Sequence, residues 1–269
     1  MLLMKKIMFL SATLALVTAC ATNPLTGKKQ IAISNESDLL PVAFQQYTDF
    51  MNSNKVITGT ADAKLVTKVG DKIKAAAIKW MTAKGYGANI KDYKWEYKLV
   101  DDKAVNAWCM PGGKIAVFTG ILPVTKNEDG LATVMGHEVA HALLAHSRSR
   151  MDAAIIQNAG SSVLGAVTNG KSSTTQQAIQ LAYGLGTNLG SLAYSRSHES
   201  EADHLGLILM TIAGYNPDNS ISFWERMAAN SKGSTPEFLS THPNNSTRIK
   251  DIKELIPSAK NEAKAYGNL

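Results

Sequence analysis

The sequence predicts a single α+β domain that is mostly helical and carries a small antiparallel sheet between its helices. Three observations predict this fold class: an apolar stripe in steps of three and four over residues 62–84, alternating apolar and polar residues over 93–99, and a return to helical patterns after Asn127. The sequence shows no internal repeat, so we expect one folded unit.

The helical segments have recognisable ends. A helix is expected over 36–51, and the striped helix over 62–84 is followed by Gly85 and Gly87, which end it. Residues 161–176 are rich in Gly, Ser and Thr, and we expect a mobile loop there.

The strands lie between these helices. Residues 93–99 have the two-residue period of a half-buried strand. Residues 105–110 and 114–119 flank Pro111-Gly112-Gly113, which predicts a hairpin. A small antiparallel sheet follows from these three strands.

The composition is that of an ordinary globular protein. The 269 residues are 45% hydrophobic and 19% charged, which argues against a disordered chain, a collagen or a polytopic membrane protein. Two cysteines are too few for a disulfide scaffold. The 28 basic and 22 acidic residues give +6, or +4 once two lysines leave with a signal peptide, and no basic stretch with interleaved aromatics accompanies this mild excess. We therefore expect no nucleic-acid partner.

The first twenty residues have the pattern of a targeting segment. Two lysines precede an apolar run over 7–19, which is shorter than the ~20 residues that a membrane-spanning helix needs. Residues 17–20, Val-Thr-Ala-Cys, resemble a bacterial lipobox, which implies cleavage before Cys20 and lipidation of that cysteine. Ala21 in place of Asp favours the outer membrane of a Gram-negative bacterium. The alternative is an ordinary secretory signal with an incidental cysteine.

The predicted organisation follows from these signals. It comprises a lipoprotein signal peptide at 1–19, the lipidated cysteine and a polar tether at 20–35, one folded domain at 36–260 and a C-terminal tail at 261–269.

Five consecutive residues, His137-Glu138-Val139-Ala140-His141, carry the strongest chemical signal. Asn127 can cap a helix there, and acidic residues suit its first turn. Residues four apart lie roughly 40° apart around a helix axis and about 6 Å apart along it, so both imidazoles can bind one ion. Glu138 can then reach a water molecule at the metal without binding the metal itself. The alternative is a chance match on a surface helix.

A catalytic zinc site needs a third protein ligand and keeps one position open. No Asp or Glu lies between Asp152 and Glu199, and Asp152 would lie ~16 Å beyond His141 on a continuous helix. Glu199 and Asp203 share a helix face, whereas Glu201 projects roughly 200° away from Glu199. We therefore predict Glu199 as the ligand, Asp203 as an acceptor that orients a histidine, and Glu201 as a solvent-facing or ion-pair residue.

The remaining histidines and the second cysteine are expected outside the ligand set. His146 lies half a turn from the first ligand on a continuous helix, so we expect it to be packed or to support a ligand from behind. His198 and His204 point away from the face of the third ligand. His242, which precedes a proline, is weak evidence by itself. Cys109 is expected to be a buried, inert thiol.

These motifs together resemble those of a known group of zinc peptidases. In chain order they are Asn106-Ala107, Pro111-Gly112-Gly113, Thr119-Gly120, Gly136-His137-Glu138 through His141, Glu199 with Ala202-Asp203 and Gly206, and His242-Pro243 with Arg248. The set is similar to the gluzincin metallopeptidases that include the CAAX prenyl proteases, the mitochondrial Oma-type protease, HtpX, BepA and LoiP. The resemblance covers 100–252 and is nearest to the soluble periplasmic lipoprotein branch.

The resemblance implies a zincin-like fold with an HExxH active-site helix and one Zn²⁺ per chain. It also implies a role for each matched residue. These roles are zinc ligation by His137, His141 and Glu199, general-base catalysis by Glu138, support of the ligands by Asp203 and Arg248, binding of extended polypeptide by Asn106, Ala107, Gly112 and Gly113, and approach of His242 to the metal as an inhibitory fourth ligand or a transition-state donor.

The expected function is that of a lipid-tethered zinc metalloendopeptidase. It would face the periplasm and hydrolyse misfolded or misassembled envelope proteins, in contact with envelope assembly machinery. The alternative is a lipoprotein chaperone or assembly adaptor with a latent or self-inhibited zinc site. Hydrolysis of a non-peptide amide also fits the ligand spacing.

Overall fold

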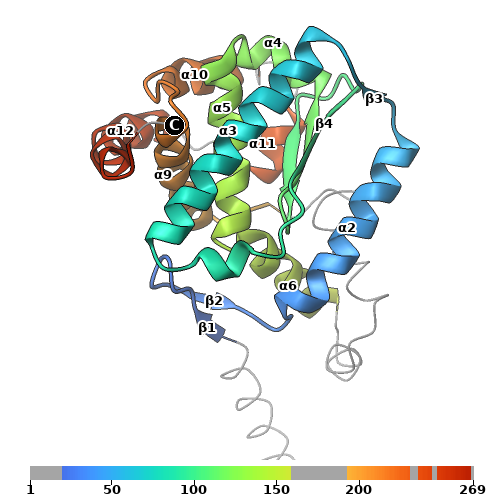
Figure 1. The fold of residues 1–269 in the computed structure, drawn as a ribbon, viewed down its shortest axis with the longest axis vertical. Coiled ribbons are helices and arrows are strands. Elements are labelled where there is room, and N and C mark those ends of the chain that lie inside the picture. Colours follow the sequence, from blue (N-terminus) through green and yellow to red (C-terminus); the bar gives the residue numbers. More distant parts are fainter. Residues whose placement is uncertain (1–19, 159–192, 231–235, 244–246, 268–269) are drawn as a thin grey trace, which may run out of the picture.

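The chain folds around a four-stranded sheet with helices on both faces (Figure 1). The computed structural model describes residues 20–158, 193–230, 236–243 and 247–267. The signal peptide and the segment 161–176 predicted to be a mobile loop lie outside these residues. In chain order the described elements are β1 (Cys20–Thr22), β2 (Lys29–Ile31), α2 (Glu36–Ser53), β3 (Val56–Ile57), α3 (Ala61–Ala83), η1 (Gly87–Ile90), β4 (Glu96–Val100), β5 (Ala107–Met110), β6 (Lys114–Phe118), η2 (Thr119–Ile121), α4 (Leu122–Thr125), α5 (Glu128–Leu143), α6 (His146–Asn158), α9 (Arg196–Ile212), α10 (Asn219–Asn230), α11 (Glu237–Thr241) and α12 (Arg248–Lys264).

The predicted helices and hairpin are confirmed within a few residues. The side chain of Thr60 caps α3 by accepting a hydrogen bond from the backbone N–H of Ala63. Gly85 follows that helix at φ +83°, a conformation that favours glycine. Strands β5 and β6 form the predicted antiparallel hairpin.

The four-stranded sheet is mixed, with the order β3-β4-β6-β5. Strand β6 enters between β4 and β5, where it runs parallel to β4 and antiparallel to β5. The sheet is therefore mixed, whereas the strand pattern predicted an antiparallel sheet. The link from β4 to β5 leaves room for β6 between these two strands.

Alternate residues of the sheet face two different layers. Leu99, Cys109 and Ile115 belong to the main core beneath α3, α5 and α9. Trp108 and Met110 belong to a second cluster beneath α2, which covers the opposite face (Figure 1). Because side chains alternate between two covered faces, β5 is buried along its whole length.

Helices α5 and α9 approach each other closely at two glycines. A Cβ on Gly206 would lie 2.9 Å from the backbone nitrogen of His137, and one on Gly136 would lie 3.0 Å from the carbonyl oxygen of Gly206. Larger residues would separate the two helices that carry the predicted ligands.

Within the described ranges, no helix is long and apolar enough to cross a bilayer.

Residues 20–35, predicted to be a polar tether, contain a pair of strands that packs against the domain. They form the antiparallel pair β1–β2, here called the N-terminal hairpin, and a short link to α2. The Asn23 side chain donates to the carbonyl of Leu144, and Asp152 accepts from the backbone N–H groups of Ile33 and Ser34. At the other end, α12 runs four residues past the predicted boundary at 260.

Candidate metal centre

The HExxH segment lies on α5, the central buried helix. Asn127 caps α5 as predicted, since its side chain accepts from the backbone N–H of Gly130 at 2.9 Å. Every residue from Gly130 to Leu143 is buried. A helix covered on all sides offers no solvent face to the two histidines, so the alternative of a chance match on a surface helix does not hold.

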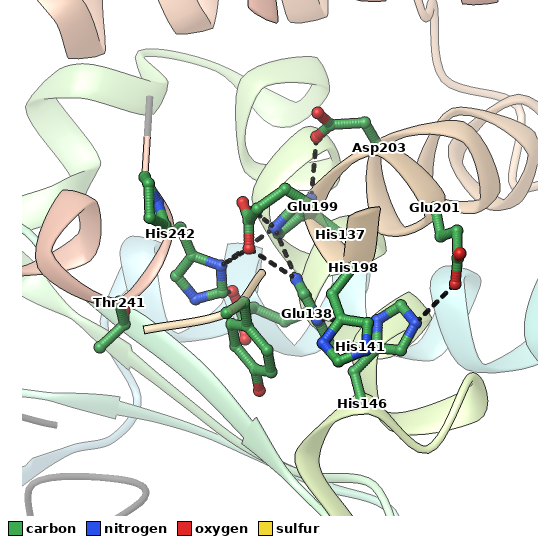
Figure 2. Close-up of polar contacts among 12 residues, drawn as sticks. His137, Glu138, His141, His146, His198, Glu199, Glu201, Asp203, Thr241 and His242 are labelled. Carbon is green, nitrogen blue, oxygen red and sulfur yellow. Dashed lines mark hydrogen bonds and ion pairs between the residues drawn. The ribbon is translucent and has the colours of Figure 1, made fainter. Parts of the chain in front are cut away.

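Four buried side chains converge on one point (Figure 2). One ligand atom from each of His137, His141, Glu199 and His242 lies within 4.8 Å of the others. His141 Nε2 lies 3.0 Å from His137 Nε2 and 3.3 Å from Glu199 Oε1. His242 Nδ1 lies 3.1 Å from Glu199 Oε1 and 3.2 Å from His137 Nε2. Histidine nitrogens and a carboxylate oxygen are the donors that zinc takes in proteins.

The donor chemistry of this cluster fits a cation. Two ring nitrogens 3.0 Å apart share at most one proton, so at least one lone pair points into the centre of the cluster. A carboxylate oxygen points to the same centre. The four residues could therefore hold one Zn²⁺, in line with the predicted cofactor.

Glu138 lies beside this cluster and outside it. Its Oε1 is 3.2 Å from Nε2 of His242, and its carboxylate also accepts from the backbone of Cys109 on β5. Burial raises the pKa of Glu138 to about 7, and the negative Glu199 adds to the rise. A carboxyl group with this pKa can take up or release a proton near neutral pH.

Arg248 and Asp203 fix two of the four converging side chains from behind. Asp203 Oδ1 lies 3.0 Å from His137 Nδ1, and Arg248 binds Asp203 through two nitrogens at 2.7 and 3.0 Å. Arg248 Nη1 also lies 2.7 Å from Glu199 Oε2, and its guanidinium stacks over Trp224. Burial alone would raise the pKa of Glu199, but His242 and Arg248 hold it well below its usual range. Both expected supporting residues therefore reach the cluster.

His146 does not lie on the continuation of α5, because that helix ends at Leu143. Ala145 has φ 55°, which redirects the chain so that α6 begins at His146. The His146 ring then faces back, with Nδ1 3.1 Å from Nδ1 of His141 and Nε2 2.9 Å from Glu201 Oε2. Of the two alternatives for Glu201, the structure shows the ion pair.

The other predicted site residues lie around the cluster. His198 stacks on His146, and His204 contacts Ser258, so neither joins the four converging side chains. Cys109 is buried as predicted, and burial raises the pKa of its thiol. Tyr194 was not predicted: its ring stacks on His141 at a centroid distance of 3.8 Å, and no local sequence pattern signals this contact.

The predicted substrate-binding residues separate into two groups. Asn106 and Ala107 lie at the start of β5, where the Asn106 side chain accepts from the Ala107 N–H and donates to Glu237 on α11. Gly112 and Gly113 form the hairpin turn with φ +84° and +78°. A Cβ there would meet Phe44 or Trp95, so the structure assigns these glycines to the turn and its packing.

The fold and the cluster together define the class of HExxH metallopeptidases, with a carboxylate from a distant helix that could complete the ligand set. Residues 73–256 match peptidase family M48, and the chain belongs to this family, as the motif resemblance predicted. The match covers α5, α9, α11 and the start of α12, the elements that carry the cluster and Arg248.

Individual relatives support the family assignment. The mitochondrial metalloendopeptidase OMA1 of Schizosaccharomyces pombe is 38% identical over 174 residues, which cover 64% of this chain and 50% of the relative. The metalloprotease YcaL of Escherichia coli is 27% identical over 95% of this chain and 98% of the relative. A putative beta-barrel assembly-enhancing protease of Vibrio cholerae is 29% identical over 62% of this chain and 36% of the relative. The chain thus spans about half the length of the fungal OMA1 relatives that it matches.

Proposed function

We propose that this protein is a zinc-dependent metalloendopeptidase. One observation carries the proposal: His137, His141 and Glu199 converge from two helices beside a buried Glu138 that does not join them. A purely structural zinc site has no use for an adjacent proton acceptor such as Glu138. Two histidines, a distant glutamate and a separate carboxyl group supply the metal ligands and the proton acceptor that zinc-dependent hydrolysis uses.

In the proposed mechanism, His137, His141 and Glu199 hold the ion and Glu138 moves the proton. Bound zinc supplies a Lewis acid that polarises a carbonyl group and lowers the pKa of water. Glu138 takes a proton from the attacking water at a carboxylate oxygen and delivers it to the nitrogen of the leaving amine. Burial keeps its pKa near the working pH, which favours both transfers.

We propose that the substrate binds as an extended strand at β5, which lies at the edge of the described sheet. This edge adjoins the site directly, because the Cys109 backbone contacts Glu138. The Ala107 N–H already donates to the side chain of Asn106. A bound peptide would have to replace this hydrogen bond. Extended binding favours unfolded or flexible segments and therefore misfolded proteins.

We propose that His242 closes the site in a resting state. Its Nδ1 lies near Glu199 and His137, and its Nε2 lies near Glu138, so it occupies the space that a water and a scissile carbonyl would need. His242→Ala is expected to raise peptidase activity at unchanged zinc content. A loss of activity with zinc retained would instead assign His242 to the transition state as a donor.

We propose that the protein is anchored to the outer membrane through a lipid on Cys20 and acts in the periplasm on misassembled envelope proteins. The lipobox-like residues 17–20 support the anchor. The similarity to a protein named as a beta-barrel assembly-enhancing protease supports a link to envelope assembly. Metabolic labelling with a fatty-acid analogue tests the anchor. We expect the wild-type protein to be labelled and Cys20→Ser to carry no label.

The direct test of activity compares Glu138→Gln with wild type in casein or quenched-peptide cleavage. Glu138→Gln is expected to keep zinc and lose activity, because the amide cannot accept the proton. Glu254→Gln, an exposed carboxylate on α12, is the matched control and is expected to behave as wild type. Turnover by Glu138→Gln at the wild-type rate would refute the mechanism. Rescue of an envelope defect by Glu138→Gln would favour the alternative of a chaperone or adaptor.

A further inference from the structure

Two side chains form a continuous hydrogen-bonded path behind His141. His141 directs Nε2 to the cluster and Nδ1 to Nδ1 of His146, 3.1 Å away. The other ring nitrogen of His146, Nε2, lies 2.9 Å from Glu201 Oε2 (Figure 2). Both histidines are buried, with 0% and 1% of their surface exposed. The path therefore runs from a carboxylate through two imidazoles to the proposed ion.

The carboxylate determines where the protons lie on this path. An ionised carboxylate only accepts hydrogen bonds, so His146 Nε2 carries a proton and donates it to Glu201. His146 Nδ1 is then a lone pair that accepts from Nδ1–H of His141. His141 is left with an unprotonated Nε2 directed at the cluster, which is the tautomer that can bind a metal. The opposite assignment would set a lone pair of His146 against the carboxylate.

The N-terminal hairpin holds the far end of this path. Lys28 Nζ lies 2.5 Å from Glu201 Oε1 and donates to Ser197 Oγ at 2.9 Å. Asn23 from the same hairpin donates to the carbonyl of Leu144 at 2.7 Å, next to the left-handed Ala145 that aims His146 at His141. A non-glycine residue in this conformation persists only where its surroundings enforce it. The hairpin contacts both the carboxylate and the helix break.

We propose that Glu201 and His146 are positioning residues that fix the metal-binding tautomer of His141, and that the docked N-terminal hairpin supports them through Lys28. The inference rests on the proposed zinc site and adds a second support, parallel to that of Asp203 behind His137. It makes metal affinity dependent on a segment that begins at the proposed lipid-bearing Cys20. Undocking of the hairpin would loosen the His146–Glu201 pair and weaken zinc binding.

Zinc affinity, measured by competition with a chromophoric chelator, tests the proposal without recourse to activity. Glu201→Ala is expected to raise the zinc dissociation constant about 10- to 100-fold, the range for partners that orient metal ligands. Lys28→Ala is expected to raise it about two- to fivefold, as for a partly exposed ion pair, and Lys28→Arg to restore it. Glu254→Ala is the matched control and is expected to equal wild type. Equal affinities for Glu201→Ala and wild type would overturn the proposal.

Nitrogen-15 NMR of histidine-labelled, zinc-loaded wild-type protein provides a second test that needs no variant. The proposal predicts a proton on Nε2 of His146 and on Nδ1 of His141. A proton on Nδ1 of His146 would overturn it even if Glu201→Ala fails to fold. A wild-type protein that binds no zinc would overturn the proposed metal site itself, whereas full zinc binding with the wrong tautomer overturns only the positioning role.

Discussion

Gly206→Ala tests the close approach of α5 and α9 that brings Glu199 to the two histidines. The added Cβ would lie 2.9 Å from the nitrogen and 3.0 Å from the Cα of His137. Both atoms are backbone, so no side chain can rotate away. Ordinary carbon contacts are about 3.5–4.0 Å, so the two helices must separate by roughly 0.5 Å.

The expected change in the free energy of unfolding combines two opposing terms. Alanine is a better helix former than glycine by about 1 kcal/mol, which on its own would stabilise α9. Overpacking of this kind costs about 1–3 kcal/mol. We therefore expect a net loss of about 0–2 kcal/mol in the free energy of unfolding. A shift of roughly 0.5 Å in the carboxylate of Glu199 is also expected to lower zinc affinity about tenfold, the lower end of the loss found when the orientation of a metal ligand is disturbed.

Urea denaturation of the zinc-free protein measures the stability term, and chelator competition measures the affinity term. Ser200→Ala, on the exposed face of α9, is the control for helix propensity and is expected to leave zinc affinity unchanged. A Gly206→Ala protein that is more stable than wild type and binds zinc equally well would show that the two helices do not need this close approach, because helix propensity alone would then explain the result.

Three further predictions follow from buried contacts. Arg248→Met leaves two buried carboxylates without their guanidinium and is expected to cost about 3–5 kcal/mol in urea denaturation; an unchanged midpoint would contradict this. Asn23→Ala removes the bond to the Leu144 carbonyl and is expected to cost about 1–3 kcal/mol, while a loss below that of the nearby Thr26→Ala would count against the docked hairpin. Cys109 is buried with a raised pKa, so a thiol reagent is expected to label it only after denaturation; rapid labelling of the native protein would disprove the burial.

The convergence of His137, His141 and Glu199 could be predicted for two reasons. The two histidines are close in sequence, and few acidic residues remained as candidates for the third position. Two histidines four residues apart on one helix share a face whatever the rest of the fold does. The third residue required a contact between distant helices, but the lack of acidic residues between Asp152 and Glu199 left few candidates. The pairing of Glu199 with Asp203 on one helix face then follows from the helical period.

The parts that could not be predicted depend on contacts without a local signal. The break that ends α5 uses Ala145 in a left-handed conformation, with neither glycine nor proline to indicate a turn, so His146 was placed on a continuous helix. Asn23 and Lys28 look like ordinary polar residues, and only long-range bonds show that their segment is folded. The position of β6 between β4 and β5 likewise depends on strand order, which residue alternation does not encode.

Anomalous diffraction at the zinc edge from crystals of the zinc-loaded protein would locate the ion itself. We expect one peak per chain, at about 2.0–2.2 Å from a ring nitrogen of His137, a ring nitrogen of His141 and a carboxylate oxygen of Glu199. A peak elsewhere in the chain, or one from which any of these three side chains points away, would contradict the proposed zinc site.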